Sequence, residues 1–342
     1  GEHKNSGYTP FVIDVTGNLI YGEMNSLIVQ ANNAYSKQML PYMRSFDWAN
    51  DGGIIRDVEL IVTGVNYIES LQTTAKPVIL TENDRQDTGA AIFGFKAFLN
   101  GDINRTQKLE WNLSKDNSKE VICCGNVDCA GQTVTIGQNL ISCVEYWHFD
   151  QPSLYILTLK LLSDGLVTDS VSCSIGFRNF HVQGSRFYLN GEAVRLCGTE
   201  WMPGSSPEFG AAKTKEQLEK MLICLKESNC VFTRFHWQQD DFVYDWCDRH
   251  GMLVQEEIPF WGGDPAVAGE TQRNVFRQQI REMIGAHCNH PSIVAWGVGN
   301  ELDAQAEETI QYIKDAIAYA HDLDTQRTSN YVSNSFYGDA RR

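Results

Sequence analysis

The strongest constraint on this fold is a regular alternation of strand-like and helix-like segments from residue 182 onward. Apolar residues at helical spacing mark the segments 214–229, 240–251, 275–291 and 306–324. Apolar runs around them predict strands at 193–201, 230–237, 252–260, 292–301 and 328–336. Thr214 is suited to cap the first helix, and Gly251 and Pro291 to end the second and third. Such alternation over short connections implies parallel strands with right-handed crossovers.

Two architectures share this pattern, a doubly wound sheet and a (β/α)8 TIM barrel. No G-x-G-x-x-G turn follows the first predicted strand, so a dinucleotide-binding sheet loses its main support. Polar residues gather at the carboxyl ends of the predicted strands: Glu200, Arg234, His236, Glu256, Glu257, Asn300, Glu301 and Asn334. A barrel builds its active site there, although a doubly wound sheet also binds ligands at strand ends. We predict five such strands, and a closed barrel needs eight.

Before residue 182 the pattern changes to short strands separated by Gly, Asn and Asp. The runs that alternate apolar with polar residues, or are rich in β-branched residues, are 27–33, 58–62, 90–101, 108–114, 120–125, 132–136, 154–162 and 170–178. Strands at this spacing predict a β-sandwich.

Composition excludes several classes of partner. The 342 residues are 42% hydrophobic and 21% charged, which is ordinary for a globular protein. The formal net charge of −15 argues against nucleic acid and anionic membranes as partners, because both require basic surface. A neutral ligand fits best. No run of about 18 apolar residues predicts a membrane span, and no signal peptide opens the sequence.

The ten cysteines do not form a metal-binding pattern. Cys123, Cys124 and Cys129 lack paired Cys-x-x-Cys spacing and a nearby His, so we expect no zinc site, and no other metal or cofactor motif is present. Free buried thiols favour a reducing compartment, so a cytoplasmic location is favoured over a periplasmic one.

The segment HPSIVAWGVGNE at 290–301 resembles the signature of glycoside hydrolase family 2, the group of β-galactosidases, β-glucuronidases and β-mannosidases. Other segments resemble the family in the same order along the chain, from its N-terminal jelly-roll through its immunoglobulin-like domain to its barrel: 3–16, 47–62, 147–161, 190–203 and 230–261. The resemblance implies a jelly-roll remnant over 1–62, an immunoglobulin-like β-sandwich over 63–181, and the first half of a TIM barrel over 182–342.

The resemblance also implies a retaining exo-β-glycosidase, most often a β-galactosidase. Retention needs two carboxyl groups about 5–5.5 Å apart. Glu301 corresponds to the acid/base, and we expect a half-buried site to keep it protonated. Asn300 would hydrogen-bond the sugar 2-hydroxyl. The family's nucleophile is a Glu on the seventh barrel strand, so we expect it outside this chain, in a longer polypeptide.

The resemblance assigns further residues to substrate binding. Arg234 would orient the nucleophile, with Glu257 or Glu301 as its available partners in this chain, and His236 would line the sugar subsite. Glu257 would point toward the mouth of the barrel, and Glu256 would be a barrel-layer or helix-facing residue, because neighbouring residues of a strand face opposite sides.

Two tryptophans, Trp201 and Trp261, could stack on the apolar face of a sugar. Glu200 and Trp201 stand where β-galactosidases usually carry Asn-Arg-His, which puts galactose specificity in doubt, and the loop at 200–210 is closer to β-mannosidases. β-Mannosidase and β-glucuronidase specificity stay open as alternatives.

A second hypothesis is a non-catalytic carbohydrate-binding fragment. Half a barrel leaves open sheet edges and an uncovered apolar interior. We therefore expect either a homo-oligomer or a further C-terminal segment to complete it, with a carbohydrate as the substrate.

Overall fold

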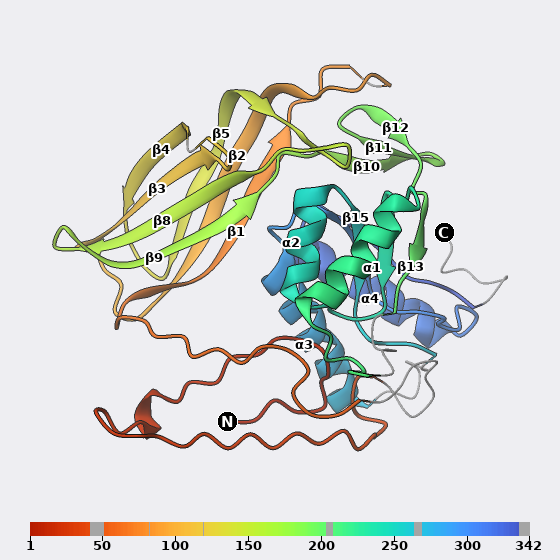
Figure 1. Ribbon diagram of the computed structural model, residues 1–342, viewed down its shortest axis with the longest axis horizontal. Helices are drawn as coiled ribbons and strands as arrows, with labels where there is room; N and C mark the ends of the chain where they lie inside the picture. Colours follow the sequence, from red (N-terminus) through yellow and green to blue (C-terminus); the bar gives the residue numbers. More distant parts are fainter. Residues whose placement is uncertain (42–50, 82, 119, 203–207, 263–268, 335–342) are drawn as a thin grey trace.

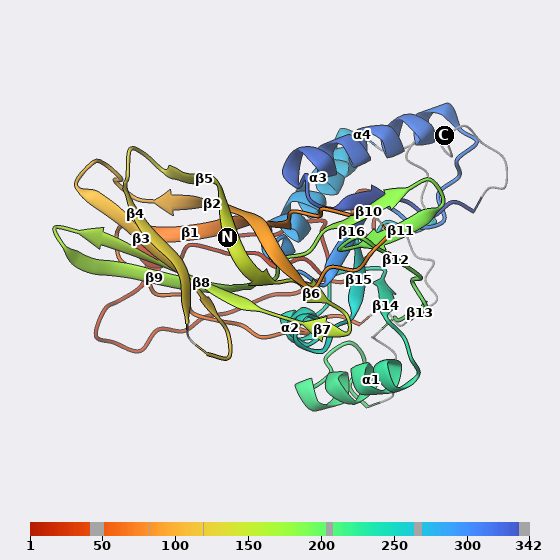
Figure 2. The same cartoon turned by 90° about the horizontal axis from the view of Figure 1, so that it is seen from above.

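The computed structural model describes residues 1–41, 51–81, 83–118, 120–202, 208–262 and 269–334. A β-sandwich and a helix-covered parallel sheet lie next to each other along the long axis of the molecule (Figures 1 and 2). Among the described residues, no helix combines the length and apolar character needed to cross a membrane.

The sandwich consists of two antiparallel sheets, with strand orders β1-β2-β5 and β4-β3-β8-β9. Its strands are β1 (Tyr67–Pro77), β2 (Thr88–Asn100), β3 (Gln107–Lys115), β4 (Val121–Asp128), β5 (Thr133–Glu145), β8 (Tyr155–Ser163) and β9 (Leu166–Ile175). Alternate residues of β3, namely Leu109, Trp111 and Leu113, are buried between the sheets, as expected for a strand with one buried face. The predicted β-sandwich is confirmed, and β6 (Trp147–His148) and β7 (Gln151–Pro152) form a short hairpin beside it.

The parallel sheet has the order β13-β14-β15-β16-β17, in agreement with the five predicted strands. Its strands are β13 (Gly198–Glu200), β14 (Phe232–Phe235), β15 (Leu253–Glu257), β16 (Ile293–Gly297) and β17 (Thr328–Asn330). Every residue of β15 and β16 is buried, which is typical of parallel strands covered on both faces. This sheet is an incomplete TIM barrel.

Four helices connect and cover these strands: α1 (Lys215–Glu227), α2 (Asp241–His250), α3 (Glu270–His287) and α4 (Glu307–Leu323). Thr214 caps α1 in a capping box with Gln217, and Gly251 ends α2 with a φ of 72°, in the left-handed region. The predicted first barrel strand is divided between two sheets, because its first half, β12 (Glu192–Val194), pairs with β11 (Arg186–Leu189) instead. β11 pairs in turn with β10 (Phe180–Gln183).

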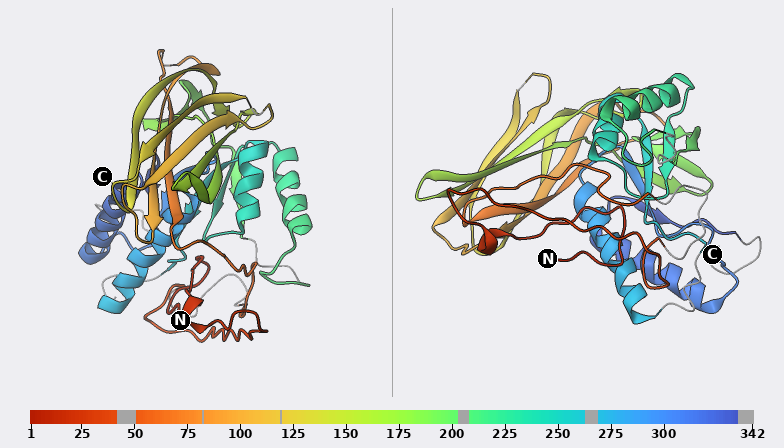
Figure 3. Two further views of the ribbon diagram at one scale, coloured as in Figure 1. Left: turned by 90° about the vertical axis from the view of Figure 1, so that its left-hand side faces the viewer. Right: turned by 60° about the horizontal axis from the view of Figure 1, so that its bottom comes forward.

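The strands predicted at 27–33 and 58–62 are wrong. Among the described residues they belong to no sheet, and the short 3-10 helix η1 (Thr16–Asn18) is the helical element of this N-terminal part. A strand forms only where it pairs with another strand, and no described strand pairs with these residues. The described N-terminal residues, 1–41 and 51–66, pass beneath the sandwich and α3 (Figure 3). The jelly-roll remnant and the domain boundaries at 62/63 and 181/182 therefore stay predictions.

Arg178 joins the sandwich to the parallel sheet at the amino end of β16. Its buried guanidinium donates to three carbonyl oxygens, those of Pro291 at 2.8 Å, Ile293 at 2.6 Å and Gln326 at 3.4 Å. The Trp147 indole makes a similar contact with the Asp248 carbonyl at 2.8 Å. The sandwich is thereby held away from the carboxyl ends of the strands, where a barrel places its chemistry.

Candidate active site

Arg234, on β14, is the centre of a hydrogen-bonded cluster at the carboxyl ends of the parallel strands. Its Nη2 lies 2.9 Å from Oε1 of Glu257, at the end of β15, and 2.7 Å from Oδ1 of Asn300, beyond β16. Its Nη1 donates to Oε2 of Glu200, at the end of β13, over 3.1 Å. One guanidinium thus connects the ends of three other strands.

Glu257 is buried beside this guanidinium, with 1% of its side chain exposed. Burial raises the pKa of Glu257 to about 7, although the Arg234 charge acts to lower it. Glu256 faces the opposite side of β15, where its Oε1 lies 2.8 Å from Nδ1 of His287 on α3. The two neighbouring carboxyl groups therefore belong to different environments, the mouth of the barrel and the helix layer.

Arg234 holds Asn300 in a defined orientation. The amide oxygen accepts from the guanidinium, which leaves the amide nitrogen to donate to a ligand. The backbone fixes the same residue, since its N–H donates to the Phe260 carbonyl at 2.8 Å and its carbonyl accepts from Gly262 at 3.1 Å. Only 4% of Asn300 is exposed, so the amide lies in the wall of the site.

Glu301 follows Asn300 but is directed to a different place. Its Oε2 accepts from the Trp261 indole at 2.8 Å, and its side chain is exposed instead of half-buried as we expected. Its φ of 51° lies in the left-handed region, which is uncommon for a residue with a side chain and is a form of strain found at functional sites. Of the two partners expected for Arg234, Glu257 lies against it, whereas Glu301 lies against Trp261.

Trp201 lies in the hydrophobic core with 8% of its surface exposed, and its ring packs edge-on against Phe235 at a centroid distance of 5.6 Å. This position suits packing and offers no open face to a sugar, so Trp201 is not carried into the proposed site. His236 is 6% exposed and its Nε2 contacts Oε1 of Glu200. Burial, and next the Arg234 charge, lower the pKa of His236 to about 4, so its imidazole is neutral near pH 7.

Three members of the cluster were not assigned to the site from the sequence, namely Glu200, Gln255 and Asn330. Glu200 bridges Arg234 and His236. Gln255 donates to Oε2 of Glu257 at 3.2 Å and accepts from Asn330, on β17, at 2.8 Å. Gln255 was identifiable, because it stands two residues before Glu257 and therefore faces the same side of β15.

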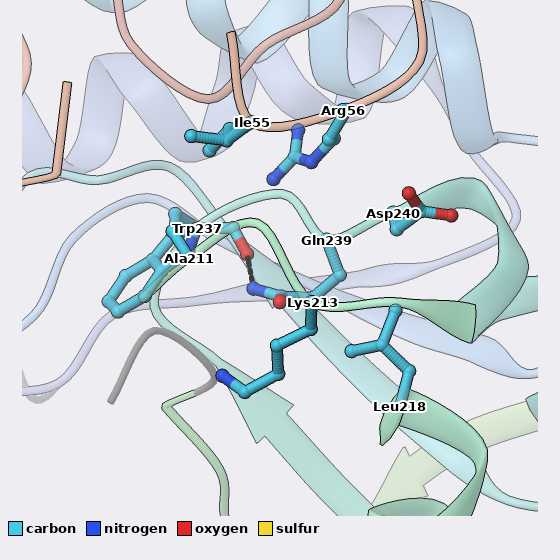
Figure 4. A pocket seen from close by; sticks show the side chains of 8 residues that line it. All are labelled: Ile55, Arg56, Ala211, Lys213, Leu218, Trp237, Gln239 and Asp240. Atoms are coloured by element: carbon cyan, nitrogen blue, oxygen red, sulfur yellow. Dashed lines mark hydrogen bonds between the residues drawn. The ribbon is translucent and has the colours of Figure 1, made fainter. Parts of the chain in front are cut away.

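Two hollows in the described part of the molecule are not lined by the side chains of this cluster. Figure 4 shows a pocket of about 20 Å³, room for roughly one water molecule, beneath Arg56 and beside Gln239, which donates to the Trp237 carbonyl at 2.6 Å. A hollow of about 240 Å³ lies between the sandwich and the amino end of β17, near Thr73 and Gln326. The first adjoins the segment that follows β14, since Trp237 and Gln239 line it, whereas the second lies on the amino-end side of the sheet.

Within the described part of the chain, one group of residues has the spacing of metal ligands. Donor atoms of Asp245, Asp248 and His290 lie within 4.8 Å of one another. Asp248 already accepts from the Ser292 amide at 2.9 Å and contacts Nδ1 of His290 at 2.6 Å. Each Asp248 oxygen thus has one protein partner, and the group lies at the amino end of β16, on the opposite side of the sheet from the strand ends where a barrel places its chemistry. All ten cysteines are free thiols.

The arrangement at the strand ends suits the binding of a polyol beside an acid. Three groups surround the Arg234 guanidinium: the oriented amide of Asn300, the buried carboxyl group of Glu257 with its raised pKa, and the half-exposed carboxylate of Glu200. The exposed Glu301 stands directly beside the oriented amide. Such convergent donors and acceptors are suited to the hydroxyl groups of a carbohydrate.

The chain matches two sequence profiles over most of its length. Residues 67–178 match the profile described as "Glycosyl hydrolases family 2", and residues 180–341 match "Glycosyl hydrolases family 2, TIM barrel domain". The matches agree with the sandwich and the incomplete barrel respectively.

Curated relatives carry two different names. A "Beta-glucuronidase" of Bacteroides fragilis is 32% identical over 98% of this chain and 49% of its own length. A "Beta-galactosidase" of Thermoanaerobacter pseudethanolicus is 30% identical over 97% of this chain and 43% of its own. The chain thus spans about half the length of these relatives or less.

Solved structures have the same fold. The crystal structure of Parabacteroides merdae β-glucuronidase superimposes with a TM-score of 0.78, over 88% of this chain and 39% of that chain, at 22% identity. Together with the profiles, these findings place the chain among glycoside hydrolases. It belongs to glycosyl hydrolase family 2.

Proposed function

We propose that this chain carries the acid/base part of a retaining exo-β-glycosidase that removes terminal β-linked sugars. The observation that supports this most is the position of Asn300 and Glu301 beyond β16, with Asn300 fixed by the Arg234–Glu257 pair. Glu301 would donate a proton to the departing oxygen and later act as base. Asn300 would hold the sugar 2-hydroxyl, a contact that strengthens in the transition state.

The remaining residues have supporting roles in this proposal. Arg234, Glu257 and His236 would line the sugar subsite, and Trp261 would position Glu301 through its indole N–H. We place the nucleophile on a barrel strand outside this chain, because Glu257, the buried carboxyl group of the mouth, is engaged with Arg234. The open sheet edges continue to predict a further barrel segment or a homo-oligomer.

The identity of the terminal sugar that is removed, the glycone, is the more specific part of the proposal. The relatives include β-glucuronidases and β-galactosidases, so the galactosidase preference expected from the resemblance is not favoured over glucuronidase activity. A non-catalytic carbohydrate-binding role is the alternative from another class, and binding without turnover would identify it.

The proposal is tested by nitrophenol release from 4-nitrophenyl β-D-galactoside and β-D-glucuronide, with the protein containing its complete barrel. We expect turnover of at least one substrate, and a loss of about 10²–10⁴-fold in kcat in Glu301→Gln, because hydrolysis of the covalent intermediate needs Glu301 as base even when the leaving group needs no proton. Glu308→Gln, an exposed change on α4, is the matched control and should keep wild-type activity. Equal activity in Glu301→Gln and the control would rule out the assigned role.

A further inference from the structure

Glu200 presents a carboxylate to the open side of the site, although it was not among the residues expected to bind substrate. It ends β13 and pairs in register with Arg234 on β14. Its side chain is 38% exposed, whereas those of Arg234 and His236 are 14% and 7% exposed. Glu200 is therefore the part of this group that a ligand reaches first.

Each oxygen of this carboxylate has one protein donor. Oε2 accepts from Nη1 of Arg234 at 3.1 Å, and Oε1 contacts Nε2 of His236. A carboxylate oxygen can accept two hydrogen bonds, so one position on each remains for a ligand. The two protein contacts fix the carboxylate, and its free positions are aimed at hydroxyl groups that can donate.

The local charges oppose a second anion at this place. The described strand ends contain three carboxyl groups of the mouth, those of Glu200, Glu257 and Glu301, and a single guanidinium, that of Arg234. The residues counted here are 198–201, 232–236, 253–257, 293–301 and 328–334. His236 adds no charge near neutral pH, because burial and Arg234 lower its pKa. Arg234 is already shared between Glu200 and Glu257. Among the described residues of the strand ends, a ligand carboxylate next to Glu200 would therefore meet repulsion without a free cation.

We propose that Glu200 is a specificity-determining residue that accepts hydroxyl groups of a neutral sugar and disfavours a uronic acid in the same position. This inference rests on the proposed sugar subsite and deepens it, since it names the class of glycone. It predicts a neutral glycone even though relatives of this chain carry the name β-glucuronidase.

The test compares two ligands that differ only at C6, phenyl 1-thio-β-D-galactoside and phenyl 1-thio-β-D-galacturonide. Thioglycosides resist hydrolysis, so titration calorimetry measures binding without turnover. The proteins are the wild type, Glu200→Gln, which removes the charge at constant size, and Glu219→Gln, an exposed change on α1 as the control. The same comparison with the corresponding aryl O-glycosides gives the ratio of kcat/KM values.

We expect the wild type and Glu219→Gln to bind the neutral ligand at least tenfold more tightly than the uronide. In Glu200→Gln the ratio of the affinity for the neutral ligand to the affinity for the uronide should fall about tenfold or more. The neutral ligand should bind more weakly and the uronide more tightly. An unchanged ratio, a wild type that prefers the uronide, or no binding of either ligand would each overturn the inference. Binding with the expected ratio but no hydrolysis would support Glu200 while contradicting the proposed glycosidase activity.

Discussion

His287 is predicted to make the stability of this protein depend on pH between about 6.5 and 9. The residue lies on α3 with 2% of its side chain exposed, and its Nδ1 faces the fully buried carboxylate of Glu256 at 2.8 Å. Its Nε2 lies 3.2 Å from Asp241, whose side chain is 83% exposed and therefore screened by solvent. Glu256 is the partner that decides the charge state.

The magnitude follows from the shift in pKa. Burial lowers the pKa of His287, but Glu256 and Asp241 outweigh burial and raise that pKa from 6.5 to about 9. Such a shift corresponds to about 3 kcal/mol. A histidine with a raised pKa stabilises the fold fully below its unfolded pKa, and this stabilisation is lost as the pH rises through the folded value. The free energy of unfolding should therefore fall by about 3 kcal/mol from pH 6.5 to above pH 9.

The assay is urea unfolding of the wild type and of His287→Gln at pH values from 6 to 10. The glutamine keeps a side-chain donor but cannot titrate, so the difference between the two proteins isolates His287 from other titrating groups. We expect the difference in unfolding free energy to be largest near pH 6 and to shrink toward pH 10. NMR titration of the His287 ring should give a pKa near 9, and a value near 6.5 would refute the reasoning.

Three further changes test particular contacts. Arg178→Met should lower the free energy of unfolding by about 1–3 kcal/mol, since it removes the donor to the buried Pro291 carbonyl and one of the two donors to the Ile293 carbonyl, and denaturant titration measures this. Thr214→Ala should cost about 1 kcal/mol in the same assay by removing the cap of α1, whereas Thr214→Ser should be close to neutral. Arg234→Met should lower the free energy of unfolding by about 3–5 kcal/mol, because Glu257 stays buried without its partner. Adding Glu257→Gln should recover part of this loss. A double variant less stable than Arg234→Met would contradict the pairing.

The elements of the parallel sheet were predictable because each carries its own local signal. Helical periodicity and the capping residues Thr214 and Gly251 give the start of α1 and both ends of α2 to within one residue. Extended segments are different, because a strand exists only where another strand pairs with it. The runs at 27–33 and 58–62 have strand-like composition but join no sheet of the described residues, whereas the polar β1 was not identified although it pairs with β2 along its length.

Part of the site was also predictable from position alone. Parallel strands end on the same edge of a sheet, which brings Arg234, Glu257 and Asn300 together once their strands are known. The direction of a residue just beyond a strand depends on loop geometry that the sequence does not show. The sequence therefore did not predict that Trp201 turns into the core or that Glu301 lies exposed against Trp261.

The central claim is that Glu301 protonates the leaving oxygen, and its most direct test is the dependence of Glu301→Gln on the leaving group. With the complete barrel, kcat/KM is compared for a 2,4-dinitrophenyl β-glycoside, whose leaving group needs no proton, and a methyl β-glycoside, whose leaving group does. The account predicts that Glu301→Gln loses about 10²–10⁴-fold on the methyl glycoside and little on the dinitrophenyl glycoside. Equal losses on both substrates would contradict it.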